Sequence, residues 1–491
     1  MTSYTMKTAI IGSWFGWLAA AIVLAKKGQQ VTVYEKNEQL GGRASVWEKD
    51  GFRRDMGPSW YLMPDAFRMF FEAVGERVED HLHLAKLMPS YKVFFHGGNT
   101  VVDIYDELEK NREIFEKLEP GSTDVLADYI AKSKYQYELA MRDFVPKNYD
   151  SIFDFFTRRT MTEGYKLHVF ENMQKYAERY FKTVEMQKIV QYPLVFLGTA
   201  PQDAPALYNI MTYVDFGMGV WYPQGWINEV IQALVRIAKK NGVTFHINSE
   251  VEKIVVEEWK VTGIQFSSGE VVAYDIVVSN ADMQWTETQM LEQKYQTYPA
   301  SYWEKKVMAP SGFVLYLWVK GKIKNLDHHT LIFADDWEKN FGQIFKDCIP
   351  PTDPSLYVCC PSKTDPSVAP DGDENLFVLV PFPAGIVMTD AEVQEYRDKT
   401  IALIEKNIWE KFADRIVVER IFWNKDFSER YHAYKGTALG LAHTLKQTAI
   451  FRPNNVSKKV KGLYYVGWYT NPGIGMPMCL ISGLLVGKRF K

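Results

Sequence analysis

The sequence predicts an α/β protein of two to three domains, and three observations lead to that fold class. The chain has 491 residues, which is more than a single hydrophobic core usually serves. With 47% apolar and 24% charged residues, its composition is that of an ordinary globular protein. Residues 8–34 have the pattern strand, glycine turn, helix and strand, which is the order of a βαβ unit.

The βαβ unit follows from the residue types in each part. Thr8 to Ile11 is a short β-branched run, Gly12 interrupts it, and the Ala/Leu-rich stretch from Leu18 to Lys27 predicts a helix. The run from Gln30 to Tyr34 predicts the second strand. The 18 uncharged residues between Lys7 and Lys26 could also form a membrane segment. The matched second strand favours the βαβ unit.

Further elements alternate along the rest of the chain, without an internal repeat of fixed period. Residues 64–206 are expected to be mostly helical, with helices over 107–118 and 164–190, and later helices are expected over 228–240, over 391–412 and from Pro477. Strands are expected over 244–256, 261–266, 271–278, 313–319, 376–380 and 462–466.

Charge and cysteine content exclude several classes of partner. The net charge is −3, with no long run of basic residues, so nucleic-acid binding is not expected. The four cysteines lack zinc-site spacing and fit a reducing compartment. The histidine pairs 81/83 and 328/329 lack the helical spacing of a zinc motif, so we expect structural histidines and no metal.

The turn after the first strand resembles a dinucleotide-binding fingerprint in which the second and third glycines are replaced. A G-x-G-x-x-G turn, followed some twenty residues later by an acid, binds a dinucleotide through its pyrophosphate and a ribose hydroxyl. Glu35 is at the expected distance for that acid. Glycine is needed at the second and third fingerprint positions for close backbone approach, which an indole opposes. The six positions are occupied in order by Gly12, Ser13, Trp14, Phe15, Gly16 and Trp17.

Gly41, Gly42 and Arg43 follow Glu35 closely and strengthen the dinucleotide interpretation. An arginine beside two glycines can place its planar fork on a phosphate. The alternative is a turn with a solvated arginine.

Six segments resemble the carotenoid (phytoene-type) desaturases, nearest to archaeal-like members, in collinear order over essentially the whole chain. The resemblance implies a GR2-type, Rossmann-like FAD-binding domain from residues 1–75, 215–285 and 440–491. It also implies a helical, membrane-facing subdomain over 76–214 and a mixed-sheet substrate domain over 286–439. The segments are VTVYEKNEQLGGRAS, GFRRDMGPSWYLMPD, SNAD, VCCPSKTD, GTALGLAHTLKQTAIFRP and LYYVGWYTNPGIGMPMCLISG.

The resemblance also implies FAD-binding positions along the chain. Gly12, Ser13 and Gly16 would form the pyrophosphate turn, Glu35 would bind the adenosine ribose, and Arg43 would make the second-motif contact with the cofactor. Trp14, Phe15, Trp17 and Lys36 are further cofactor-binding positions. The remaining positions implied are Gly42, Gly57, Pro58, Ser59, Val251, Gly467, Trp468, Gly475, Met476 and Pro477.

The implied reaction is FAD-dependent dehydrogenation of phytoene or a related C40 polyene, with hydride transfer to flavin N5. No catalytic acid or base stands out in the sequence. The aromatic-rich stretch 196–223 could be ordinary core or the lining of a polyene tunnel. The implied partners are the long apolar polyene and a membrane surface, contacted peripherally from the cytoplasmic side.

Two alternatives stay open. A variant whose cofactor site is blocked by tryptophan would still fold and could bind a polyene without chemistry. A flavin isomerase, saturase or amine oxidase of the same superfamily would keep the cofactor and change the reaction. The first alternative rests on Trp14 and Trp17, which replace fingerprint glycines and are two of the 14 tryptophans of the chain. Six of them stand where the family has glycine or another small residue: Trp14, Trp17, Trp226, Trp259, Trp318 and Trp468.

Overall fold

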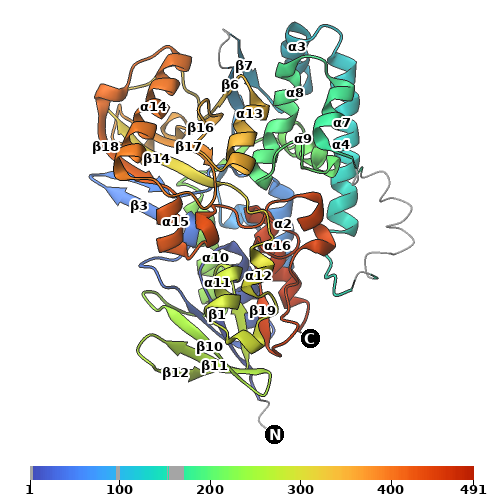
Figure 1. Ribbon diagram of the computed structural model, residues 1–491, viewed down its shortest axis with the longest axis vertical. Coiled ribbons are helices and arrows are strands. Elements are labelled where there is room, and N and C mark those ends of the chain that lie inside the picture. Colours follow the sequence, from blue (N-terminus) through green and yellow to red (C-terminus); the bar gives the residue numbers. More distant parts are fainter. Residues whose placement is uncertain (1–3, 96–99, 152, 154–167, 169–170, 491) are drawn as a thin grey trace.

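The computed structural model describes residues 4–95, 100–151, 153, 168 and 171–490. Two sheets dominate it and lie toward opposite ends of the long axis, as Figure 1 shows. The smaller sheet contains the N-terminal strand, and the larger sheet lies beside the helices of the middle of the chain.

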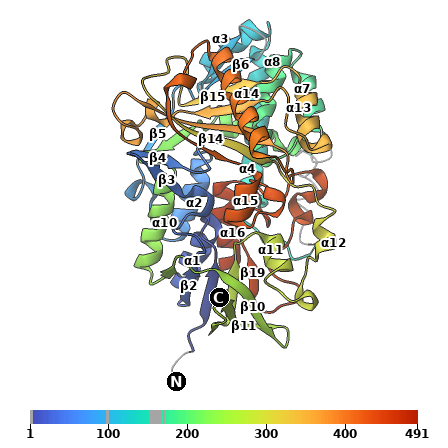
Figure 2. The ribbon, with the colours of Figure 1, turned by 60° about the vertical axis from the view of Figure 1, so that its left-hand side comes forward.

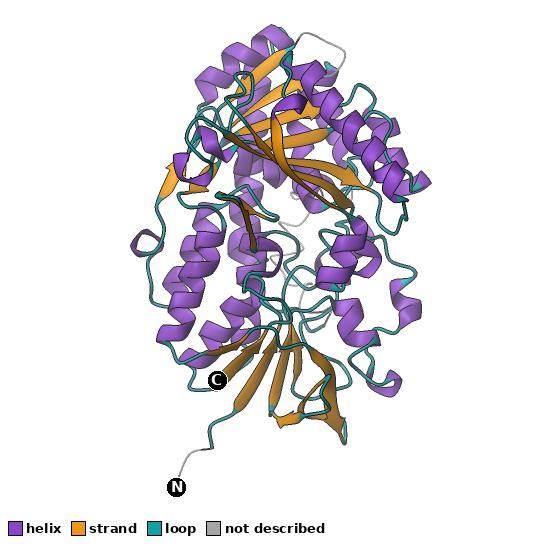
Figure 3. Cartoon of the chain, turned by 90° about the vertical axis from the view of Figure 1, so that its left-hand side faces the viewer, coloured by secondary structure: helices purple, strands orange, loops and turns teal. Residues whose placement is uncertain are grey.

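The smaller sheet is entirely parallel and has the strand order β19-β13-β1-β2-β9. Its strands come from the three segments 1–75, 215–285 and 440–491, although the domain boundaries themselves stay a prediction. In Figure 3 the strands form a fan near the N-terminus. Their bounds are β1 Lys7–Ile11, β2 Gln30–Tyr34, β9 Thr244–His246, β13 Ile276–Ser279 and β19 Leu463–Tyr465.

Helix α1 (Phe15–Lys26) is buried on nearly all sides, because α10 (Asn228–Lys240) and α16 (Met476–Gly487) both pack against it. Two glycines of α16 permit this close approach. A Cβ on Gly483 would lie 2.5 Å from the Cβ of Ala19, and one on Gly487 would lie 2.2 Å from Cγ1 of Val23. Helix α1 therefore depends on the C-terminal helix α16 for its burial.

The larger sheet has the order β18-β14-β17-β16-β15-β6-β7 and is antiparallel except for the parallel pair β15–β6. Side chains alternate between its two faces. Phe313 and Leu315 of β14 pack with α14, whereas Val314 and Tyr316 face the middle helices. Figure 2 shows α14 crossing its face of the sheet. The bounds are β6 Tyr91–Phe95, β7 Val101–Ile104, β14 Ser311–Val319, β15 His329–Phe333, β16 Leu356–Cys359, β17 Glu374–Phe382, β18 Ile416–Phe422 and α14 Asp390–Ile408.

Smaller elements complete the fold. The fold also contains three short antiparallel sheets, β10-β11-β12, β3-β4 and β5-β8. Their strands are β3 Val46–Lys49, β4 Phe52–Asp55, β5 Leu84–Lys86, β8 Trp221–Pro223, β10 Val251–Glu257, β11 Lys260–Phe266 and β12 Val271–Ala273. The other helices are α2 Pro64–Ala73, α3 Leu108–Leu118, α4 Thr123–Asp143, α7 Met173–Tyr180, α8 Val184–Gln191, α9 Ile210–Phe216, α11 Met283–Thr288, α12 Ala300–Trp303, α13 Trp337–Gly342 and α15 Asn424–Tyr431.

The βαβ unit and the helix over 228–240 are confirmed, and four other expectations are corrected. The segment 64–206 is not mostly helical throughout, because it contributes β6 and β7 to the larger sheet. The helix expected over 164–190 lies partly outside the described residues; the rest forms α7 and α8, separated at residues 181–183. The single strands expected over 244–256 and 271–278 are each two strands in different sheets.

The described part of the chain contains no helix that combines the length and the apolar character needed to cross a membrane. The 18 uncharged residues between Lys7 and Lys26 form β1, the glycine turn and α1 instead.

Candidate functional site

The turn between β1 and α1 has the backbone of a dinucleotide-binding turn. Gly12 has φ +98°, a conformation that favours glycine, and its N–H donates to the carbonyl of Tyr34 at 2.8 Å. The Ser13 hydroxyl accepts from the N–H groups of Gly41 and Gly42 at 3.1 Å each. These bonds hold the second glycine turn beside the N-terminus of α1, where backbone N–H groups attract an anion.

Glu35 lies at the end of β2 and is buried. One carboxylate oxygen accepts from the backbone and side-chain N–H groups of Asn37, both at 2.8 Å. Burial raises the pKa of this carboxyl above its ordinary value. The next residue, Lys36, points its ammonium group to His432 Nε2 at 2.9 Å. The structure thus brings Glu35 to the end of the strand where a ribose hydroxyl would bind, and Val251 is buried at the start of β10.

Arg43 is a buried guanidinium without an acidic partner. Within the described residues no carboxylate lies at ion-pair distance, Nε has no hydrogen bond, and the terminal nitrogen donates weakly to the Thr437 carbonyl at 3.3 Å. The group lies over the rings of Trp468 at 4.4 Å and Tyr431 at 4.8 Å. Burial lowers the pKa of this arginine. The Asp282 carboxylate acts on Arg43 from beyond ion-pair distance, so the buried cation can still bind a phosphate directly.

Gly57 shows how closely the backbone approaches this arginine. A Cβ at Gly57 would lie 2.3 Å from the Arg43 carbonyl oxygen, so any other residue would displace the chain. Pro58 and Ser59 follow it along the wall of a cavity. The second glycine turn and this loop are therefore fixed against each other.

The C-terminal loop closes the same region. Gly467 has φ +98°, and a Cβ there would lie 2.4 Å from the side-chain nitrogen of Asn280. Gly475, with φ +114°, is the N-cap of α16, and Met476 and Pro477 begin that helix. All three line the cavity. The predicted positions from both ends of the chain are thus brought together, although their cofactor contacts stay a prediction.

Trp14 and Trp468 occupy the space in front of these polar groups. Their rings lie 5.4 Å apart, and the Trp14 ring meets Phe15 edge to face at 5.0 Å. Trp14 is 9% exposed and Trp468 is 8% exposed. The donors suit an FAD pyrophosphate and ribose, but a dinucleotide that reaches them must displace the Trp14 indole, which stands beside the Gly42 turn.

Trp17 is accommodated differently. Its side chain is fully buried and meets Phe245 of β9 edge to face at 5.8 Å. It therefore fills the interface between α1 and the sheet, where the fingerprint glycine allows close packing. Its indole N–H has no hydrogen-bond partner among the described residues, which is unfavourable for a buried donor.

A cavity of about 470 Å³ extends from Trp14 and Arg43 to the larger sheet, and this is the size of a ligand site. Its lining is mainly apolar and aromatic. Part of the aromatic-rich stretch expected to be core or tunnel does line it. The lining residues of that stretch are Phe196, Leu197, Leu207, Tyr208, Ile210, Met211 and Val214.

Two hydrogen-bonded groups in the cavity wall were not predicted from the sequence. The Tyr357 hydroxyl bonds Ser59 Oγ at 2.8 Å and His329 Nδ1 at 2.7 Å. His443 Nε2 accepts from the Ile474 N–H at 3.2 Å, which leaves the proton on Nδ1, toward Tyr208. These residues lie in different strands and loops. Only the H in GTALGLAHTLKQ could have suggested one of them, through its place in a recognised segment.

The family of the chain follows from its sequence relatives. The model of the flavin containing amine oxidoreductases matches residues 18–489, and the chain belongs to that family. Among curated relatives, the carotenoid 3,4-desaturase of Haloarcula japonica is 45% identical over 96% of each chain. The zeta-carotene-forming phytoene desaturase of Myxococcus xanthus is 34% identical, over 98% of this chain and 93% of the relative. Within the family, the chain groups with the carotenoid desaturases.

Solved structures agree with this fold. An oxidoreductase from Methanosarcina mazei has a TM-score of 0.63 at 17% identity and covers 98% of this chain and 100% of its own. Putrescine oxidase bound to putrescine has a TM-score of 0.63 at 13% identity, with 99% coverage of both chains. At these identities the likeness concerns the fold alone. The chain belongs to a flavin-containing family, and the two curated relatives do not favour an isomerase, a saturase or an amine oxidase.

Proposed function

We propose that this chain is an FAD-dependent desaturase that removes two hydrogens from a long, apolar polyene of the carotenoid type. The observation that carries the proposal is the apolar cavity of about 470 Å³ that begins at Arg43 and the fingerprint turn. The activities named for the relatives support the same reaction. Phytoene and later C40 intermediates are the candidate substrates.

The polar groups described above would hold the cofactor. Arg43 and the N-terminus of α1 would bind the pyrophosphate, and Glu35 would accept a hydrogen bond from a ribose hydroxyl. The flavin, when bound, supplies a hydride acceptor for an unactivated CH2–CH2 pair. The protein's own part is to place the chain of the substrate and to keep water away.

The cavity lining supports that second role. Aromatic and aliphatic side chains from β14, β15 and β17 form one wall, and Met141 and Phe144 near the end of α4 form another. Ser59 and Tyr357 satisfy each other's hydroxyl groups in the wall. A polyene therefore meets few unpaired polar atoms, which favours a hydrocarbon over a polar substrate.

We also propose peripheral contact with a membrane on its cytoplasmic side. The cavity reaches Thr448 and Ala449, and the neighbouring side chains of Leu445 and Phe451 are exposed by 37% and 56%. Exposed apolar groups beside an apolar cavity give a hydrocarbon a short route from a bilayer. The four cysteines are free thiols, which suits a reducing compartment.

The reaction is tested with FAD-loaded protein and phytoene in liposomes. The expected result is a product with a longer conjugated system, detected by chromatography and its red-shifted absorption. Loaded protein that leaves phytoene, a partly desaturated C40 polyene and a fully conjugated C40 polyene with saturated ends all unchanged would refute the proposal.

Membrane contact is tested separately by sedimentation with the same liposomes. Phe451→Asp should reduce the bound fraction. Val387→Asp is the matched control, because Val387 is 92% exposed and does not line the cavity. Equal binding by both variants would contradict the proposed contact surface.

A further inference from the structure

A buried cluster of two histidines and one cysteine lies beneath the cavity wall. His329 is the first residue of β15 and pairs with Cys359 across the antiparallel ladder, and His328 precedes it. The three side chains are buried, and one potential ligand atom from each lies within 4.8 Å of the others. Strand pairing therefore brings together residues that stand thirty positions apart in the sequence.

The hydrogen bonds of the two imidazoles leave one nitrogen free on each ring. His328 Nδ1 bonds Thr364 Oγ1 at 2.7 Å, and His329 Nδ1 bonds the Tyr357 hydroxyl at 2.7 Å. Both Nε2 atoms are buried and have no hydrogen-bond partner among the described residues. An unpaired buried nitrogen is costly, and each of these two rings also belongs to the cluster with the Cys359 sulfur.

This arrangement is that of a metal-binding histidine pair. Histidine ligands usually bind the ion through one nitrogen while the other is hydrogen-bonded and so fixes the ring. Ring stacking adds to the fixation, because Trp60 lies parallel to His329 at 4.1 Å and Tyr222 meets His328 edge to face at 4.7 Å. The rings are thus held in place before any ion binds.

We propose that His328, His329 and Cys359 bind one Zn²⁺ ion. Nitrogen and thiolate are the ligands that Zn²⁺ prefers, with bonds of about 2.0–2.3 Å, so the ligand atoms must move inward by roughly 1 Å. Binding replaces the thiol proton of Cys359, which is released to water, by a sulfur–zinc bond.

The ion would complete the wall of the cavity without taking part in the redox step. His329 is joined through the Tyr357 hydroxyl to Ser59, which lines the cavity. Fixing the imidazole fixes this chain of hydrogen bonds. The Asp365 carboxylate, which accepts from Tyr222 and Gly225, does not belong to the cluster of potential ligand atoms.

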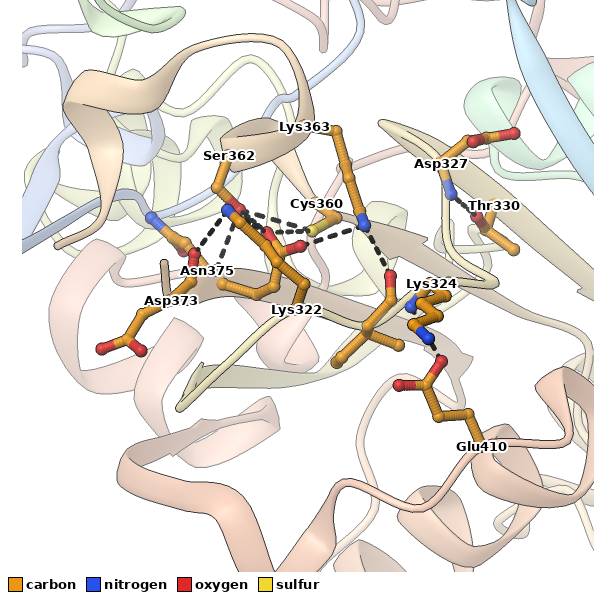
Figure 4. Close-up of polar contacts among 12 residues, drawn as sticks. Lys322, Lys324, Asp327, Thr330, Cys360, Ser362, Lys363, Asp373, Asn375 and Glu410 are labelled. Carbon is orange, nitrogen blue, oxygen red and sulfur yellow. Dashed lines mark hydrogen bonds and ion pairs between the residues drawn. The ribbon is translucent and has the colours of Figure 1, made fainter. Parts of the chain in front are cut away.

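The adjacent cysteine provides a matched control. Cys360 lies on the other face of its strand, where its sulfur donates to Glu374 at 3.3 Å and lies 3.4 Å from Ser362 Oγ. Figure 4 shows Cys360 directed into this group, with Lys363 on the same carboxylate. Its environment is equally buried, but its sulfur does not belong to the cluster of ligand atoms around the two histidines.

The experiment measures metal content in the full-length chain expressed in zinc-supplemented medium, without an affinity tag that binds metal. Elemental analysis should find one zinc per chain. Cys359→Ser and His328→Gln should each lower this by tenfold or more, whereas Cys360→Ser should retain it. Cobalt-grown protein should show a thiolate-to-cobalt absorption band that is lost in Cys359→Ser and in His328→Gln and retained in Cys360→Ser.

Either of two results would overturn the proposal: folded wild-type protein with less than a tenth of an equivalent of zinc, or equal loss in Cys359→Ser and Cys360→Ser. Circular dichroism identifies variants that do not fold. If Cys359→Ser is one of them, the cobalt spectrum of the wild type and the zinc content of His328→Gln decide the outcome. A wild type with no thiolate band then refutes the site.

Discussion

Replacing Trp14 with glycine removes the indole that stands in front of the dinucleotide-binding donors. The side chain is 9% exposed and packs against Phe15 and Trp468. Its backbone φ of −88° is unstrained, so glycine changes the space in the site more than the path of the chain. The expected result is tighter FAD binding.

The size of the effect follows from the contacts that FAD must break. Moving a buried aromatic side chain into water costs about 1.5–3 kcal/mol, and losing aromatic pair contacts adds about 0.5–1 kcal/mol. A total of about 2–4 kcal/mol corresponds to a factor of about 30–700 in Kd. The lower end applies if the indole swings into the apolar cavity instead of into water.

Fluorescence titration of FAD into flavin-free protein measures this change directly and does not require turnover. Wild type, Trp14→Gly and Trp259→Gly are compared under the same conditions. Trp259 is the matched control, because it lies in the β10–β11 turn and is 52% exposed. Flavin retained through purification gives a second readout.

Equal FAD affinity in wild type and Trp14→Gly would refute the displacement argument. An equal gain in Trp259→Gly would also refute it, since the effect would then come from removing any tryptophan. If neither wild type nor Trp14→Gly binds FAD, the donors around Arg43 do not form the proposed site.

Three further results are expected. Arg43→Lys should weaken FAD binding about tenfold in the same titration, since a single ammonium cannot replace the planar fork. Burial raises the pKa of Asp215 to about 7, so the folded state holds a proton that the unfolded state has lost between pH 4 and 7. The free energy of unfolding should therefore fall by up to about 4 kcal/mol as the pH rises from 4 to 7. In urea titrations, the free energy of unfolding of Asp215→Asn should depend less on pH. Burial opposes ionisation of Glu374, but hydrogen bonds from Ser362 and Lys363 outweigh it and lower its pKa. The ionised Glu374 carboxylate thus stabilises the fold at pH values above its ordinary pKa. This stabilisation is lost as the pH falls through the pKa of Glu374 in the folded protein. Glu374→Gln should cost about 1–3 kcal/mol in urea unfolding at pH 7, and less at low pH.

Local patterns in the sequence were enough to predict the elements that local chemistry determines. The β-branched runs around Gly12 gave β1 and β2, and the spacing of apolar residues gave α10 with its observed bounds. The strand over Tyr91–Phe95 was not recognised in the same way, because one of its two partner strands is distant in the sequence. It is a strand because it pairs with β15, more than two hundred residues further along the chain.

The residues of the candidate site also differ in whether local sequence patterns could predict them. Glu35 and Arg43 could be proposed from their spacing to the fingerprint. Tyr357 and His329 could not, since their roles come from which strands are neighbours in the larger sheet. Trp14 was recognised as an obstacle from glycine chemistry alone, and the structure adds which groups its indole covers.

The packing of α1 against α16 has a consequence for synthesis of the chain. Helix α1 is apolar on nearly all sides and is made long before its cover, residues 476–487. During translation α1 is thus an exposed apolar helix that chaperones can bind. The nascent chain can complete its dinucleotide-binding sheet only after release of the C-terminal segment from the ribosome, so folding of this part is late whatever the order of the middle elements.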